Sequence, residues 1–243
     1  MSQHTSDSLP VLAGKHALVT GANRGIGLAL TQQLVAEGHH MWATHRPQAD
    51  TGALQRLQET ARSRLKLVPL DVRNLADCQA FSQSLGAQPI DVLWNNAGLL
   101  LDREADITAL DFDHYAAMLE VNTLGPLRVI QSLLPQLRRS QHAKILNLSS
   151  VMGSIGKGGA GASGYRTSKA ALNRALRTVA EDVRQWNIAV LCLHPGWVKT
   201  DMGGLAADID ISESAQGLIR MMHNSTLADT GQFWDYQGKV LPW

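Results

Sequence analysis

Short, β-rich apolar segments alternate with longer segments of helical periodicity along the whole chain. The apolar segments predict strands near residues 16–20, 40–44, 65–70, 90–94, 144–149, 188–194 and 232–234. Helical patterns lie between them, at about residues 25–37, 54–63, 75–84, 111–139, 165–186 and 212–223. This alternation is typical of repeated βα units, so the chain is expected to form a doubly wound, mostly parallel α/β sheet of about seven strands with helices on both faces.

No linker or internal repeat divides the 243 residues. We expect a flexible N-terminal arm over residues 1–13 and a single domain over residues 14–243. Pro126 lies inside the fourth helical pattern, where its missing amide hydrogen and its ring predict a bend or a division into two helices. The only low-complexity stretch, residues 153–164, is rich in Gly, Ser and Ala.

The charge balance excludes several classes of partner. The chain carries 22 Lys and Arg against 21 Asp and Glu, which gives no general footprint for nucleic acid or an anionic membrane. No signal peptide and no apolar run of about 18 residues is present, so a cytoplasmic protein is expected. Cys78 and Cys192 fall in helical and strand-like patterns, which favours buried thiols in a reducing compartment. The nine histidines show no ligand spacing, and no metal is expected.

A glycine-rich turn directly follows the first predicted strand and opens the first helix. Gly21 would allow the tight turn, Gly25 the close approach of a phosphate, and Gly27 the packing of helix against strand. The helix N-terminus would then offer free N–H groups to a pyrophosphate. In this Rossmann-type context the turn predicts dinucleotide binding, although three glycines can also serve a structural turn alone. The residues assigned to the cofactor here are Gly21, Asn23, Arg24, Gly25, Ile26 and Gly27.

The end of the second predicted strand indicates which dinucleotide is bound. An Asp or Glu there would bind the ribose 2′-hydroxyl of NAD(H), but this chain has Thr44, His45 and Arg46. Arg24 and Arg46 could converge on a 2′-phosphate, which favours NADP(H) over NAD(H). The alternative is that Arg46, next to Pro47, is an ordinary surface charge.

Tyr165 and Lys169 are four residues apart near the start of a long predicted helix, so they share one helical face. A neighbouring ammonium would lower the phenol pKa from about 10 toward working pH, as a general acid or base requires. Taken alone, the pair is weak evidence, because in most proteins such a pair belongs to a solvated helix face.

These features occur together in an order that resembles the short-chain dehydrogenase/reductase family over about residues 15–243. The subgroup that the chain resembles contains C-factor-like and carbonyl-reductase-like members. The markers are the glycine turn, Asp71-Val72, Asn95-Asn96-Ala97-Gly98, Asn122, Ser149-Ser150, Tyr165 with Lys169, and Pro195-Gly196.

The resemblance implies a cofactor site beyond the carboxyl ends of the strands. Asp71 and Val72 would flank the adenine, and Val198 and Thr200 would hold the nicotinamide carboxamide. Structural alternatives remain, since Asp71 could cap the next helix, and Asn95 and Asn96 could make turn hydrogen bonds. The further residues implied at the cofactor are Asn96, Ala97, Gly98, Tyr165, Lys169, Pro195 and Gly196.

The resemblance also implies NADP(H)-dependent hydride transfer between the nicotinamide and a carbonyl or alcohol. Tyr165 would be the general acid/base, Ser150 would orient the carbonyl, and Lys169 would tune the phenol and bind the ribose. Asn122 would complete a proton relay through water. Ser149 is the alternative to Ser150, because adjacent strand residues point to opposite sides and only one can face the site.

Residues 197–210 are expected to form a short substrate lid, with Trp197, Met202 and Leu205 lining an apolar pocket for a small carbonyl or alcohol. These side chains could instead pack on the domain. Apolar residues on more than one face of the long helices predict a homodimer or homotetramer, though core packing explains most of them equally well. Two other functions remain open: an NADP(H)-sensing regulator with little turnover, and a C-factor-like signalling protein.

Overall fold

The computed structural model describes residues 14–243, and the predicted arm of residues 1–13 lies outside the described residues. Seven strands form one sheet in the order β3-β2-β1-β4-β5-β6-β7, and every neighbouring pair is parallel. The predicted fold class is thereby confirmed, with strand ends within about two residues of the predicted ones. The strands are β1 His16–Val19, β2 His40–His45, β3 Leu65–Pro69, β4 Val92–Asn95, β5 Lys144–Leu148, β6 Ala189–His194 and β7 Gln232–Asp235.

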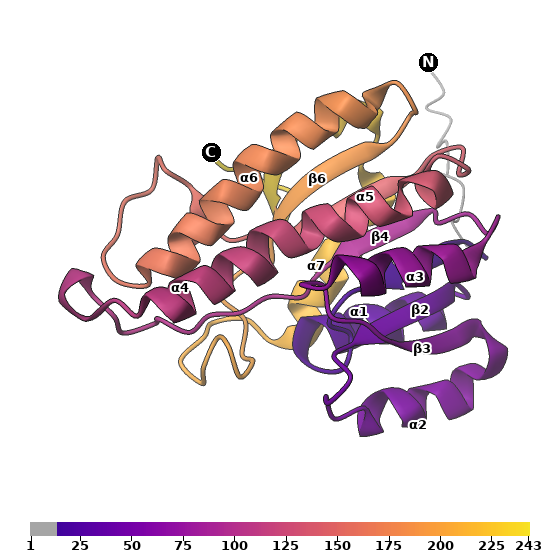
Figure 1. Ribbon diagram of the computed structural model, residues 1–243, viewed down its shortest axis with the longest axis horizontal. Helices are drawn as coiled ribbons and strands as arrows, with labels where there is room; N and C mark the ends of the chain where they lie inside the picture. The colour runs from indigo at the N-terminus through magenta and orange to yellow at the C-terminus, as the bar shows by residue number, and fades with distance from the viewer. Residues whose placement is uncertain (1–13) are drawn as a thin grey trace, which may run out of the picture.

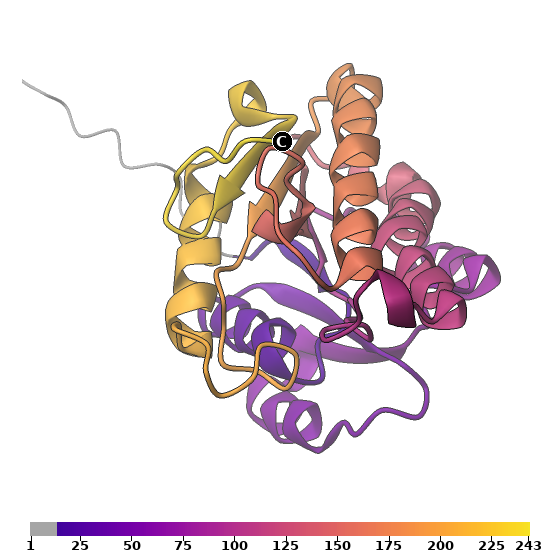
Figure 2. The ribbon, with the colours of Figure 1, turned by 90° about the vertical axis from the view of Figure 1, so that its left-hand side faces the viewer.

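Helices cover both faces of the sheet (Figures 1 and 2). One layer contains α1 Gly25–Ala36, α2 Gly52–Ala61 and α7 Ile211–Asn224. The other contains α3 Leu75–Leu85, α5 Gly125–Leu137 and α6 Ser163–Arg184, which run side by side in front of the sheet in Figure 1. Helix α4, Phe112–Leu119, packs against the first turns of α6. Short 3₁₀ turns lie at Arg62–Arg64, Ile107–Ala109, Val151–Gly153 and Leu227–Asp229.

The central strands are largely apolar because most of their residues are buried, on one face of the sheet or the other. Along β1, Ala17 and Val19 pack into the core beneath α1 and α7, whereas Leu18 packs into the core beneath α3, α5 and α6. Successive strand residues point to opposite faces, so apolar side chains are favoured at most positions of a central strand. Cys78 and Cys192 are buried and unpaired, as expected.

The helical pattern over residues 111–139 forms two helices, as predicted, but the division precedes the proline. Helix α4 ends at Leu119, a π-helical turn covers Glu120–Leu124, and α5 begins at Gly125. Pro126 therefore sits in the first turn of α5, where its missing N–H needs no partner. A π-helical turn is frequent at functional sites, and this one carries Asn122.

The strand order reverses direction between β1 and β4, which are neighbours in the sheet but separated in sequence by β2 and β3. Such a switch point leaves a crevice outside the carboxyl ends of the strands. Within residues 14–243, no helix is both long and apolar enough to cross a bilayer. The same residues contain no cluster of three or more His, Cys, Asp or Glu side chains able to hold a metal ion.

A buried lysine joins the sheet to the end of α7. Lys144 Nζ, at the start of β5, donates hydrogen bonds to the carbonyl oxygens of Met222 at 2.6 Å and Ser225 at 2.5 Å. These contacts satisfy carbonyl groups that a helix end otherwise leaves without partners. Burial lowers the pKa of Lys144 from 10.5 to about 8.

Replacing this lysine tests the contact. Lys144→Met keeps an apolar stem and removes the donors, so the free energy of unfolding should fall by about 1 kcal/mol at neutral pH. Between pH 8 and 10.5, Lys144 of the unfolded wild-type chain keeps a proton that Lys144 of the folded chain has released. The free energy of unfolding of the wild type should therefore rise relative to that of the variant as pH increases through this window. Urea denaturation of both proteins at pH 7.5, 9 and 10 measures the difference, and a pH-independent difference would contradict the buried position of the ammonium.

Candidate functional site

A cleft of about 660 Å³ opens at the carboxyl ends of the strands, at the switch point of the sheet. Most residues that the sequence assigned to a site lie on its walls. These are Gly21, Asn23, Arg24, Gly25, Ile26, Arg46, Asp71, Val72, Asn96, Ala97, Gly98, Tyr165, Lys169, Pro195 and Thr200. The assigned residues that do not line it are Gly27, Asn122, Ser150, Gly196 and Val198.

Some wall residues were not predicted from the sequence. Several of them directly adjoin a predicted residue in the chain, and this adjacency is the only feature of the sequence that could have indicated them. The sequence does not show which of two adjacent side chains points into the cleft. They are Leu70, Arg73, Leu99, Val121, Leu148 and Ile211.

The glycine turn is held by Asn96 from the loop after β4. Asn96 Nδ2 donates to the carbonyl oxygens of Thr20 at 2.8 Å and Gly21 at 3.0 Å. Gly21 and Gly25 have φ values of +64° and +55°, a conformation that favours glycine. A Cβ on Gly27 would lie 2.4 Å from Asn96 Nδ2, so this glycine packs on the Asn96 side chain rather than facing the cleft. The turn hydrogen bonds expected as an alternative for Asn96 are therefore present, and Asn96 also lines the cleft.

Asn95 does not belong to this turn, so the turn alternative was wrong for that residue. Its Nδ2 donates to Asn147 Oδ1 at 2.8 Å, and both side chains are buried between β4 and β5. This bond joins two neighbouring strands directly beneath the cleft.

Asp71 pairs with Arg73 and does not cap α3. Arg73 Nη2 lies 2.6 Å from Asp71 Oδ2, and Arg73 Nε bonds both carboxylate oxygens. These hydrogen bonds hold the pKa of Asp71 below its usual value, with a smaller contribution from the Arg46 charge. The cap of α3 is Asn74, whose Oδ1 accepts from Ala76 N at 3.0 Å, so the alternative of an Asp71 cap is wrong.

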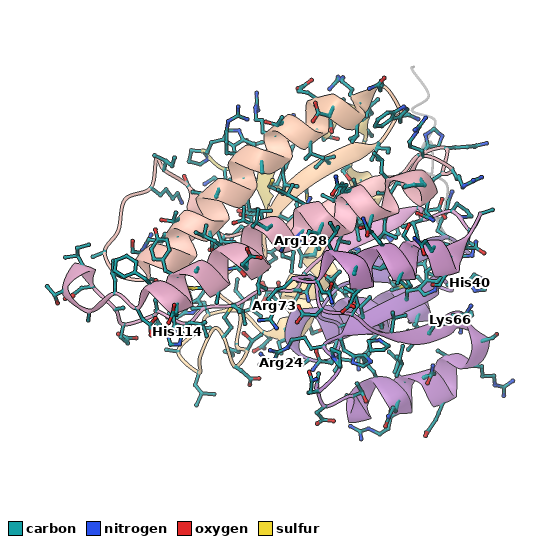
Figure 3. The ribbon with its side chains drawn as sticks, viewed as in Figure 1. Arg24, His40, Lys66, Arg73, His114 and Arg128 are labelled. Atoms are coloured by element: carbon teal, nitrogen blue, oxygen red, sulfur yellow. The ribbon has the colours of Figure 1, made fainter. Side chains whose placement is uncertain are left out.

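Three arginines gather at the glycine-turn end of the cleft: Arg24, Arg46 and Arg73. Figure 3 shows Arg24 and Arg73 at this end of the sheet. Arg24 pairs with Asp201 and Arg73 with Asp71, whereas Arg46 makes no ion pair within residues 14–243. Guanidinium groups grip phosphate in a fixed, bidentate geometry, so this end of the cleft suits an anionic group.

Tyr165 and Lys169 come together as their spacing predicted. Both project from the first turns of α6 into the cleft wall, and Lys169 Nζ lies 5.8 Å from the centre of the Tyr165 ring. Each is buried, with 9% of Tyr165 and 5% of Lys169 exposed. Lys169 Nζ donates to the Leu148 carbonyl oxygen at 2.7 Å, which fixes the ammonium at the end of β5.

The expected lowering of the phenol pKa is wrong for this structure. Burial raises the pKa of Tyr165 to about 12, against the opposing effects of a hydrogen bond with Ser150 and the charge of Arg103. Burial likewise lowers the pKa of Lys169 to about 8. Loss of solvation dominates both groups, and the ammonium is directed at Leu148 rather than at the phenol oxygen.

The two adjacent serines point to different partners. Ser149 Oγ donates to Asn173 Oδ1 at 2.5 Å, inside the core beneath α6. Ser150 lies beside the Tyr165 phenol, whose pKa its hydroxyl lowers, and its Oγ accepts from Met152 N at 3.1 Å. The hydroxyl beside the phenol is therefore that of Ser150, while Ser149 contributes only to the cleft wall.

Asn122 has no exposed side-chain surface, and its amide links two segments that flank the cleft. Its Oδ1 accepts from Leu99 N at 2.7 Å, and its Nδ2 donates to Leu99 O at 2.8 Å and Ser168 Oγ at 2.9 Å. The side chain thus ties the loop after β4 to α6. Its polar atoms are occupied by these contacts rather than directed into the cleft.

Residues 197–210, the predicted lid, form a loop closed on itself. Thr200 Oγ1 accepts from Gly203 N at 2.9 Å, and Trp197 Nε1 donates to Gly203 O at 2.9 Å. Val198 is buried and bridges to Ile209. Met202 and Leu205 line the cleft, whereas Trp197 does not, so the expected apolar wall is present only in part.

An arginine that the sequence did not single out connects this loop to the opposite side. Arg103, in the loop between β4 and α4, donates from Nη2 to the carbonyl oxygen of Met202. This contact joins two loops from different ends of the sequence beside the Tyr165 end of the cleft.

Comparison with known proteins identifies relatives with this arrangement. The family model for short chain dehydrogenase matches residues 15–208. The chain is 39% identical to C-signal of Myxococcus xanthus over 168 residues. This match covers 68% of this chain and 99% of C-signal. It is 31% identical to a 1-hydroxy-2-glutathionyl-2-methyl-3-butene dehydrogenase of Rhodococcus, which covers 93% of this chain and 98% of that protein.

Solved structures of carbonyl reductases have the same fold as this chain. The carbonyl reductase Sniffer of D. melanogaster superposes with a TM-score of 0.88 at 31% identity, covering 95% of this chain and all of that one. An NADPH-bound carbonyl reductase from chicken fatty liver gives a TM-score of 0.87 at 36% identity, covering 96% of this chain and all of the other. The matched family and the shared fold lead to one conclusion: the chain belongs to the short-chain dehydrogenase family of oxidoreductases.

Proposed function

We propose that the protein is an NADP(H)-dependent oxidoreductase that transfers a hydride between the nicotinamide and a carbonyl or alcohol substrate. The observation that carries this proposal is the gathering of Tyr165, Lys169 and the Ser150 hydroxyl at one wall of the cleft whose far end holds the glycine turn and three arginines. A dinucleotide laid along the cleft would join these two ends. No other described part of the chain combines a phosphate cradle with an acid/base pair.

The residues present fit such a cofactor. Gly25 leaves room for a pyrophosphate at the N-terminus of α1, since a Cβ there would meet only the Thr200 methyl group, at 3.6 Å. Free N–H groups and the helix dipole favour an anion at this position. We assign Asp71 and Val72 to the adenine end, and Thr200 and the Val198 backbone to the nicotinamide end. When bound, the dinucleotide supplies the hydride, and the chain contributes placement and electrostatics.

The acid/base chemistry then follows from the two buried groups. With a pKa raised to about 12, Tyr165 is protonated at neutral pH and is suited to give its proton to an oxygen that gains charge during reduction. Ser150, beside the phenol, would donate a second hydrogen bond to that oxygen. Lys169 stands beside Tyr165 with its ammonium held at the Leu148 carbonyl oxygen, and we assign this ammonium to the ribose of the dinucleotide. Asn122 holds the loop and helix that flank this pair.

The arginines favour NADP(H) over NAD(H). No carboxylate stands at the end of β2 to bind a ribose 2′-hydroxyl, and Arg46 there lines the cleft without an ion-pair partner in the described chain. Arg24 lies opposite, paired with the exposed Asp201. A 2′-phosphate would occupy the space that these guanidinium groups share, and the solved carbonyl reductase with NADPH bound is consistent with this choice.

The substrate end is apolar and open. Leu99, Met202 and Leu205 line it, and 98% of the Leu205 side chain is exposed. We infer a small ketone or aldehyde as substrate in the reductive direction. A homodimer or homotetramer and a cytoplasmic location stay predictions.

The similarity to C-signal favours one further candidate, a signalling protein that binds NADP(H) and turns over little. Sensing a dinucleotide does not require a buried phenol, hydroxyl and ammonium in contact. Oxidation of NADPH across a panel of carbonyl compounds, followed spectroscopically, discriminates the two: a clear rate favours the enzyme, whereas tight NADPH binding without turnover favours the sensor.

Removing the phenol oxygen tests the acid. Tyr165→Phe should lower kcat by about 10² or more, the scale of a positioned acid/base, and leave the dissociation constant for NADPH within about twofold. Tyr236→Phe is the matched control, because that phenol bonds Glu213 on α7 and does not line the cleft. Steady-state kinetics and a fluorescence titration with NADPH provide both numbers, and unchanged turnover in Tyr165→Phe would reject Tyr165 as the acid.

Removing one guanidinium tests the cofactor preference. Arg46→Ala should lower kcat/KM for NADPH about tenfold, the value of one charge-assisted hydrogen bond, and barely change that for NADH. Arg174→Ala, an exposed arginine on α6 that bonds only Thr178, serves as the control. Comparable kcat/KM values for NADH and NADPH in the wild type would rule out the NADP(H) assignment.

A further inference from the structure

Helix α6, which carries Tyr165, starts without a cap of its own. Ala162, the residue before it, has φ 50° and ψ 42°, the left-handed conformation that a residue with a Cβ rarely adopts. No side chain at this position bonds the free N–H groups of the first turn. A helix end buried in this way needs another source of acceptors.

Asp102 supplies the acceptor from a distant part of the chain. Its Oδ2 accepts from Gly164 N at 2.6 Å across 62 residues of sequence, and only 7% of Asp102 is exposed. The carboxylate also lies where the positive end of the helix dipole favours a negative charge. Its other oxygen, Oδ1, is buried and has no hydrogen-bond partner among the described residues.

A side chain at Gly164 would crowd its neighbours. A Cβ there would lie 2.5 Å from Met118 Cε and 3.1 Å from Asp102 Oδ2. Helix α4, which carries Met118, therefore presses directly against the start of α6, and the absence of a side chain lets Asp102 reach the backbone N–H. The sequence thus provides both the acceptor and the space that it needs.

The remaining anchors of this turn lie after Tyr165. Thr123 Oγ1 donates to Ser168 O at 2.8 Å, and Tyr115 OH donates to Thr167 Oγ1 at 2.7 Å. Before Tyr165, Asp102 bonds the adjacent residue, Gly164, and Arg166 Nε donates to Gly161 O at 3.0 Å, outside the helix. The phenol consequently stands between an anchor at Gly164 and anchors at Thr167 and Ser168.

We propose that Asp102 is a positioning residue for Tyr165: by accepting from Gly164 N it sets where the first turn of α6 holds the phenol beside Ser150. This inference rests on the proposed function, in which Tyr165 is the proton donor. Displacing a reacting group by about 1 Å can cost about 10² in rate, so a loosened first turn should act on turnover rather than on cofactor affinity.

Three variants separate positioning from general stability. Asp102→Ala removes the acceptor, Asp102→Asn keeps an oxygen acceptor without the charge, and Asp106→Ala is the matched control. Asp106 lies in the same loop and accepts from Thr108 N at 2.8 Å and Thr108 Oγ1 at 2.6 Å, but it touches no residue of the cleft. Steady-state kinetics with NADPH, NADPH-binding stoichiometry and amide hydrogen exchange at Gly164 are measured on each full-length protein.

Asp102→Ala is expected to lose about tenfold or more in kcat while binding one equivalent of NADPH with KM within about twofold, and its Gly164 amide should exchange faster. Asp102→Asn and Asp106→Ala should stay within about threefold of the wild type, since the first keeps the hydrogen bond and the second is remote. If Asp102→Ala does not fold, Asp102→Ser, whose hydroxyl ends one atom short of the carboxylate oxygen, takes its place with the same expected loss.

Two results would overturn the positioning role. Wild-type turnover in Asp102→Ala would do so while leaving the proposed function intact, and so would an equal loss in Asp106→Ala. A wild type that binds NADPH yet reduces no carbonyl would instead overturn the proposed function and the positioning role together. Fast Gly164 exchange only in the Asp102 variants would then show that the anchor serves the fold alone.

Discussion

The parallel pairing of β1 with β4 is the constraint on which the whole site depends. It brings the segments that follow these two strands together at the carboxyl end of the sheet, although they lie about 75 residues apart in sequence. Asn96 can therefore donate to the carbonyl oxygens of the glycine turn. Gly27 makes this contact close, since any side chain there would meet the Asn96 amide. The phosphate cradle is therefore a tertiary structure made by two loops rather than a local property of the glycine motif.

Desolvation is the dominant electrostatic effect at the other end of the cleft. The phenol of Tyr165 and the ammonium of Lys169 are both buried, and burial moves each pKa toward the neutral form. In the proposed function the protonated phenol is the acid for reduction, and Lys169 stands beside it. The pair works through burial and orientation, with the Leu148 carbonyl holding the ammonium in place.

Much of the remaining structure holds the first turn of α6. Asn122 and Thr123 on the π-helical turn bond Ser168, and Asp102 bonds Gly164. A π-helical turn inserts an extra residue, which redirects the following helix while keeping these side chains on the α6 side. The loop after β4 is thus shared by both ends of the site, because Asn96 belongs to it and Asp102 follows six residues later.

The sequence alone determined the alternation of strands and helices, the glycine turn and the spacing of Tyr165 and Lys169, because periodicity and i,i+4 neighbours are local properties. It also placed most of the cleft residues at the ends of strands. Only the tertiary structure decided that Asn74 rather than Asp71 caps α3 and that burial raises the phenol pKa. It also places Ser150 rather than Ser149 beside the phenol, in agreement with the choice that the family resemblance implied. Arg73, Arg103 and Asp102 were likewise invisible in the sequence, since side-chain direction, solvation and contacts across 60 or more residues arise only when the sheet has assembled.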